Sequence, residues 1–63
     1  MLTARQVEVV RLMADGMEKK AIARRLGITT NTVKLHVAEI YRRLGVETAT
    51  GAVGRCFREG WIE

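Results

Sequence analysis

A chain of 63 residues holds one domain, residues 1–63, and a domain this small buries only about 60% of the surface that its unfolded form exposes. Its only cysteine, Cys56, excludes an internal disulfide, and the Cys/His spacing of a zinc site is absent, so no metal or other cofactor is expected. Eleven Lys and Arg against seven Asp and Glu give a net charge of +4, which favours an acidic partner such as nucleic acid.

The first half of the chain predicts two helices separated by glycine. Thr3 and Gln6 have the spacing of a capping box, which marks the start of a helix over residues 4–15. The apolar residues of this helix share one broad face, and Gly16 supplies a left-handed stop. A shorter helix with one apolar side follows over residues 19–26.

The third predicted helix covers residues 30–44 and is the segment most informative about function. Thr29 is placed to cap its start, and Gly45 is placed to end it. At about 100° per residue, one narrow apolar stripe faces the core and consists of Val33, Val37, Ile40 and Leu44. The opposite side carries Asn31, Lys34, Leu35, Ala38 and Arg42, and one flank carries Thr32, His36 and Arg43.

A fourth helix is predicted over residues 48–59. Its apolar face consists of Ala49, Ala52, Val53, Cys56 and Phe57. Gly51 and Gly54 each weaken it by roughly 1 kcal/mol relative to Ala, so this helix depends on packing. No strand pattern competes with these segments, and the predicted fold class is therefore all-α, a compact domain of four helices.

The second and third predicted helices have the arrangement of a helix-turn-helix, because a short turn with Gly27 joins them. Basic residues concentrate there: residues 17–43 hold seven Lys and Arg against two Glu, a net charge of +5. In such a unit the later of the two helices, here the one over residues 30–44, enters the major groove, and its free N-terminal amides attract phosphate. The pattern predicts binding of duplex DNA through the outward side of the third helix.

Three stretches resemble the LuxR/NarL type, or GerE-like, DNA-binding domain over nearly the whole chain. They are LTARQVEVVRLMADG at 2–16, IARRLGITTNTVKLHV at 22–37 and IYRRLGV at 40–46. The resemblance implies the DNA-binding domain of a transcriptional regulator, in which helices two and three read DNA and helix four forms a dimerisation surface. A homodimer would place two third helices in major grooves about 10–10.5 bp apart.

The resemblance also assigns positions at the DNA. Lys34 matches the lysine that projects into the major groove, beside Leu35 and Ala38. Residues that match positions toward the DNA backbone are Lys20, Thr29, Thr32 and His36. The helical wheel adds Asn31, Arg42 and Arg43, and the two arginines fit either DNA contact or a solvated face. The expected dimer contacts are Ala49, Ala52, Val53 and Cys56, of which Cys56 fits the core equally well.

Two other functions remain open at this point. Region four of sigma factors has a similar helix-turn-helix and reads promoter DNA within RNA polymerase, which makes polymerase a further candidate partner. A helix-turn-helix used as a protein-interaction module would pair through the fourth helix, but it would not need Lys20, Lys34 and Arg42 to act together.

Catalysis and membrane insertion have little support in the sequence. No nucleophile stands at a fixed spacing from a base, and neither paired carboxylates nor a Gly-rich phosphate loop occurs, so an enzyme is not expected. No apolar run approaches the ~18 residues that span a bilayer, and the start lacks the layout of a signal peptide. We therefore expect a cytoplasmic protein without membrane contact.

Overall fold

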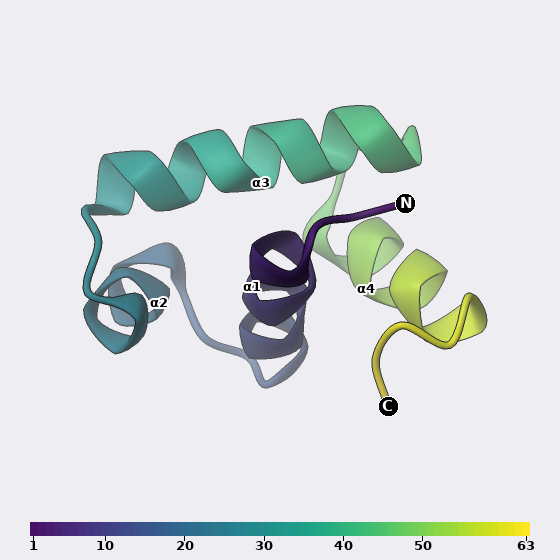
Figure 1. Ribbon diagram of the computed structural model, residues 1–63, viewed down its shortest axis with the longest axis horizontal. Coiled ribbons are helices and arrows are strands. Elements are labelled where there is room, and N and C mark those ends of the chain that lie inside the picture. The colour runs from purple at the N-terminus through teal and green to yellow at the C-terminus, as the bar shows by residue number, and fades with distance from the viewer.

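The computed structural model describes residues 1–63. It has four helices, α1 (Ala4–Ala14), α2 (Lys19–Leu26), α3 (Thr30–Leu44) and α4 (Ala49–Arg58), and no strand. The longest helix, α3, runs along one side of the molecule, while the other three gather on its opposite side (Figure 1). The predicted all-α fold of four helices is confirmed. None of these helices has the length and apolar character that a membrane crossing requires.

The helix ends follow the predicted signals to within one residue. The Thr3 hydroxyl accepts the backbone N–H of Gln6 at 3.1 Å, and the Gln6 side chain accepts the N–H of Thr3 at 2.8 Å. This reciprocal pair is the predicted capping box. At the start of α4, Thr48 lies outside the helix, because its hydroxyl caps the N–H of Gly51 at 3.0 Å. The left-handed stops are also present: Gly27 has φ +70° and Gly45 has φ +67°.

One apolar core joins all four helices and both terminal segments. Its members are Leu2, Val9, Val10, Leu12, Ile22, Ala23, Val33, Val37, Ile40, Leu44, Ala52, Cys56 and Ile62. All four residues of the predicted α3 stripe belong to it, so that prediction is confirmed. Because α3 packs against α1, α2 and α4 through this one stripe, its opposite side is left to solvent.

The prediction for α4 needs correction. Ala52, which we expected at a dimer contact, is completely buried in the core of the single chain, and so is Cys56, for which the sequence left core and dimer contact open. Phe57, which we placed on the same face, is 62% exposed. At about 100° per residue the apolar arc from Ala52 to Phe57 spans about 140°, and α4 buries only one edge of an arc this broad. The other edge carries the half-buried Val53, which packs against the core, and the exposed Phe57, which faces outward.

Candidate nucleic-acid interface

The outward side of α3 forms the candidate interface. Its residues are all exposed, namely Asn31, Lys34, Leu35, Ala38 and Arg42. Leu35 stands out because it is a large hydrophobic side chain and 70% of its surface is exposed. The core stripe on the opposite side of the helix fixes this orientation, so a partner that approaches α3 from outside meets these five side chains first.

The flank of α3 adds side chains at the edge of this face. Thr32 and His36 are half-buried there, and Arg43 is exposed. Thr29 and Lys20, which lie just before α3 and at the start of α2, are also exposed. The structure thus places all ten predicted DNA contacts on α2, on α3 or at the junction between them. None of the ten lies in the core.

The N-terminus of α3 is capped in a way that leaves donors free. The Thr29 hydroxyl accepts the backbone N–H of Thr32 at 3.1 Å, whereas the amides of Thr30 and Asn31 have no acceptor. The Thr29 and Thr32 hydroxyls also lie 2.9 Å apart and share one hydrogen bond. One of these two hydroxyl hydrogens therefore remains available. Together with the free amides and the positive end of the helix dipole, it suits an anion.

Most basic side chains are free of carboxylate partners. Only Arg5, Arg42, Arg43 and Arg55 lie within 4 Å of one. The remaining seven of the eleven Lys and Arg are unpaired, namely Arg11, Lys19, Lys20, Arg24, Arg25, Lys34 and Arg58. All four basic side chains of α2, together with Lys34, are thus available to neutralise phosphates. This neutralisation is the main source of affinity for nucleic acid.

The C-terminal half of α3 differs, because Glu39 binds two arginines there. One Glu39 oxygen accepts from Nε of Arg42 at 3.1 Å, and the other accepts from Nε of Arg43 at 2.9 Å. The hydrogen bonds from Arg42 and Arg43 lower the pKa of Glu39 from 4.5 to about 2. The bond to Glu39 in turn raises the pKa of Arg42.

Neither a role for Glu39 nor the exposure of Phe57 was predicted from the sequence. The signal for Glu39 was present, because an acid three and four residues before two arginines is a helical ion-pair spacing. The exposure of Phe57 had no such signal, since it depends on how α4 is rotated against α1 and α3.

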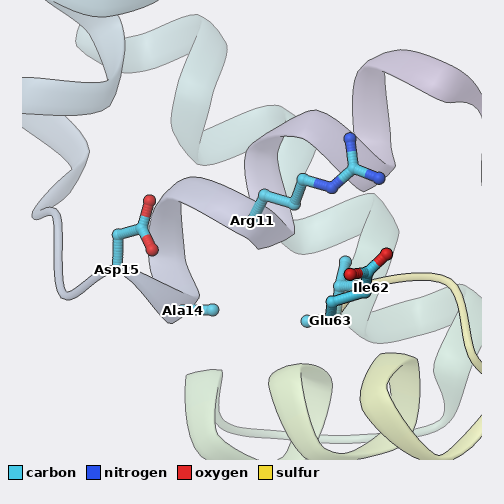
Figure 2. Close-up of a pocket in the computed structure, with 5 residues that line it drawn as sticks. All are labelled: Arg11, Ala14, Asp15, Ile62 and Glu63. Carbon is cyan, nitrogen blue, oxygen red and sulfur yellow. The ribbon is translucent and has the colours of Figure 1, made fainter.

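Clefts elsewhere are small and lie away from the outward side of α3. The cleft in Figure 2, of about 300 Å³, lies between α1 and the C-terminal residues and is lined by Arg11, Ala14, Asp15, Ile62 and Glu63. In that view Arg11 and Asp15 project from α1, and Ile62 and Glu63 lie across from them. A second cleft, of about 500 Å³, lies beside Lys20 and is lined by Met13, Met17, Tyr41 and others. These volumes lie at the lower end of the range for small-molecule pockets.

Comparison with known proteins places the chain in a family. Residues 1–55 match the GerE model, which describes bacterial regulatory proteins of the luxR family. Transcriptional regulatory protein DegU of Brevibacillus brevis is 39% identical over 62 residues, which cover 98% of this chain and 26% of DegU. The putative HTH-type transcriptional regulator YhjB of Escherichia coli is 47% identical over 51 residues, which cover 81% of this chain and 26% of YhjB.

A solved structure agrees with the fold. The response regulator ChrA of a heme-sensing two-component system superposes with a TM-score of 0.94 and 32% identity, over 98% of this chain and 31% of ChrA. The chain thus spans about a quarter to a third of the length of these relatives. Its own helix-turn-helix is the α2–α3 unit. The chain therefore belongs to the luxR family of bacterial regulatory proteins.

Proposed function

We propose that this chain binds duplex DNA sequence-specifically, as the DNA-reading domain of a transcriptional regulator. The observation that carries the proposal is the outward side of α3, where the unpaired Lys34 lies next to the exposed Leu35. The relatives support the proposal, because DegU and YhjB are named as transcriptional regulators. A binding role rather than catalysis follows from the same features.

In the major groove, the side chains of α3 have distinct roles. Lys34 donates to O6 and N7 of guanine, the groove acceptors that a lysine reads best. Leu35 contacts the methyl group of a thymine, and its exposure in the free protein fits this apolar contact. Asn31 at the first turn reaches a base or a phosphate, and Ala38 lets the helix approach closely.

Contacts with the DNA backbone fix the helix in the groove. Lys20 on α2 approaches a phosphate, and Arg43 lies on the flank of α3 that faces the DNA backbone. His36 lies on the same flank and makes no side-chain hydrogen bond within the chain, so its ring is free for a backbone contact. Thr29 and Thr32 supply one free hydroxyl hydrogen between them, and the amides at the helix start supply further donors.

A homodimer through the outer edge of α4 completes the proposal. Val53 and the 62% exposed Phe57 lie on that edge. Beside it runs a groove of about 370 Å³, lined by Met13, Ala14, Ala49, Thr50, Val53 and Gly54. In a two-fold dimer the same patch meets itself, so Phe57 of one copy and this groove of the other bury each other's apolar surface. Ala49 and Val53 of the predicted dimer residues take part, and the buried Ala52 and Cys56 support them from beneath.

Two alternatives make different predictions. A promoter reader of the sigma region-four type would co-purify with RNA polymerase core enzyme. A protein-interaction module would bind no duplex DNA even at low salt. The basic side chains of α2 and Lys34 have no carboxylate partner, and they favour DNA over both a protein partner and an enzyme substrate.

The first test is a salt titration of binding to random duplexes of about 20–30 bp, for the wild type and Lys34→Ala. Affinity should fall steeply with log salt. On a duplex selected from a random pool by the wild type, Lys34→Ala should cost roughly 1–3 kcal/mol of binding and relax sequence preference. The control is Arg11→Ala, which removes the same charge from α1, where the side chain is exposed and unpaired. Equal losses for both variants would argue against base readout, and absence of binding at low salt would refute the proposed function.

A further inference from the structure

The Glu39 carboxylate accepts hydrogen bonds from both Arg42 and Arg43 in the C-terminal half of α3. Besides the bonds to the two Nε atoms at 3.1 Å and 2.9 Å, Glu39 accepts a hydrogen bond from Nη2 of Arg42, so the Arg42 pair is bidentate. Arg43 is held a second time, because its Nη1 donates to the carbonyl oxygen of Met1 at 3.3 Å. Neither guanidinium can offer its full set of donors to a new partner while these bonds persist.

Glu39 lies where a carboxylate opposes the proposed function. At about 100° per residue it falls between Arg42 and Arg43 on the wheel of α3, next to His36 on the flank proposed to face phosphate. In that row its carboxylate binds both guanidiniums and so keeps their donors from phosphates. The N-terminal half of α3 has no such restraint, since Lys34 has no acidic partner.

The ion pairs are not a device for stability. The side chains are 72% exposed in Arg42, 40% in Arg43 and 36% in Glu39. Exposed pairs of this kind contribute little to folding, because solvent already screens the charges. Both guanidiniums are open to solvent, so DNA phosphates can compete with Glu39 for them, and the carboxylate affects binding more than it affects folding.

We propose that Glu39 restrains binding to the DNA backbone, because it holds Arg42 and Arg43 and so lowers the affinity of α3 for DNA of any sequence. Phosphate contacts do not distinguish sequences, whereas base contacts do. A carboxylate that weakens the phosphate contacts lowers the affinity for specific and random DNA by similar factors, and the base contacts of Lys34 and Leu35 then supply a larger share of the remaining binding. This inference rests on the proposed function and names the residue that limits its non-specific part.

The experiment compares the wild type with Glu39→Gln on random 25 bp duplexes at salt concentrations from 50 to 200 mM. If both freed arginines reach phosphate, the slope of log affinity against log salt should steepen by about 1.8. The variant should therefore bind more tightly at 50 mM, and this advantage should shrink about tenfold by 200 mM. The control Glu8→Gln removes the same charge from α1, where Glu8 pairs with Arg5 at 3.3 Å, and should change the slope little.

The same change in a variant that lacks both arginines separates the restraint on Arg42 and Arg43 from direct repulsion between Glu39 and the DNA backbone. In Arg42→Gln/Arg43→Gln, the further change Glu39→Gln should no longer steepen the slope. A gain that persists there would show that Glu39 acts on DNA directly, and the inference would be wrong. Weaker binding of Glu39→Gln to a duplex selected from a random pool by the wild type would mean that Glu39 reads a base, which also overturns it. If the wild type binds no duplex at all, the proposed function itself fails.

Discussion

The hydroxyl of Thr29 lies 2.9 Å from the hydroxyl of Thr32, and the same Thr29 oxygen accepts the backbone N–H of Thr32 at 3.1 Å. A residue proposed to touch the DNA backbone is thus also the N-cap of the helix that enters the groove. Loss of the Thr29 side chain would affect folding and binding together, so its variants must be compared with one that keeps the cap.

Thr29→Ala should lower the free energy of unfolding by about 1 kcal/mol, within a range of roughly 0.5–2 kcal/mol, because the N–H of Thr32 loses its acceptor. Thr29→Ser keeps the hydroxyl and should retain most of the stability. Urea denaturation followed by circular dichroism measures both variants. Equal stabilities for Ala and Ser would mean that the hydroxyl at position 29 does not cap α3 in solution.

The arrangement around α3 could be predicted from the sequence because each part of it is local. The cap, the stripe of Val33, Val37, Ile40 and Leu44, and the stop at Gly45 all follow from spacing along one helix. The outward side then follows by exclusion. The ion pairs of Glu39 were also readable from spacing, but the bond from Arg43 to Met1 joins residues 42 positions apart and could not be read from a local pattern.

Two glycines in α4 should respond differently to alanine. A Cβ at Gly54 would meet only the Arg58 guanidinium at 3.5 Å, whereas one at Gly51 would lie 3.2 Å from the Thr48 cap oxygen and 3.3 Å from Cβ of Val46. Gly54→Ala should therefore stabilise the fold by up to about 1 kcal/mol through helix propensity. Gly51→Ala should gain less or lose stability, because its neighbours must shift.

Thermal unfolding measures the difference between these variants. For a domain of this size, 1 kcal/mol corresponds to about 4–8 °C in Tm. The comparison requires a protein concentration at which the wild type is monomeric, since Gly54 also lines the groove proposed for the dimer. A larger gain for Gly51→Ala than for Gly54→Ala would contradict the packing around the start of α4.

Two exposed hydrophobic residues should separate dimer formation from DNA reading. Phe57→Ser removes the 62% exposed ring from α4 and should weaken self-association with little effect on the monomer. Leu35→Ser removes a side chain that is 70% exposed on α3 and should leave self-association unchanged while it reduces discrimination at one base pair. Sedimentation equilibrium reports the first effect and competition with variant duplexes the second. If Phe57→Ser self-associates as the wild type does, the dimer does not use this edge of α4.

The rotation of α4 is the part of the fold that the sequence analysis missed. Its apolar arc admits several orientations, and only the contacts with α1 and α3 select the one that buries Ala52 and Cys56. Such contacts join residues far apart in the chain. A helix with a narrow stripe, such as α3, leaves no similar freedom.

Cys56 tests this orientation chemically. The thiol has no exposed surface, and burial raises its pKa, so its reactive thiolate is both rarer and inaccessible in the folded chain. Reaction with a thiol reagent should be slower in buffer than in denaturant, by up to roughly a hundredfold for a stability of about 3 kcal/mol, because it requires local unfolding of α4. Rapid labelling of the folded protein would place Cys56 at the surface and favour the dimer contact over the core position.

The titration of Glu39 gives a test of its ion pairs without DNA. Hydrogen bonds from Arg42 and Arg43 lower its pKa from 4.5 to about 2, so the folded state keeps the carboxylate charged at pH values where the unfolded chain protonates it. The stabilising contribution is therefore fully present above pH 4.5 and is lost as the pH falls from 4.5 toward 2.

Carboxyl chemical shifts in an NMR titration follow the ionisation of Glu39 directly. In Arg42→Gln/Arg43→Gln the pKa should return toward 4.5, and about 1 M salt should raise it in the wild type because charges are screened within about 3 Å. A wild-type pKa near 4.5 at low salt would mean that the two arginines are already free in solution, and Glu39→Gln would then have nothing to release.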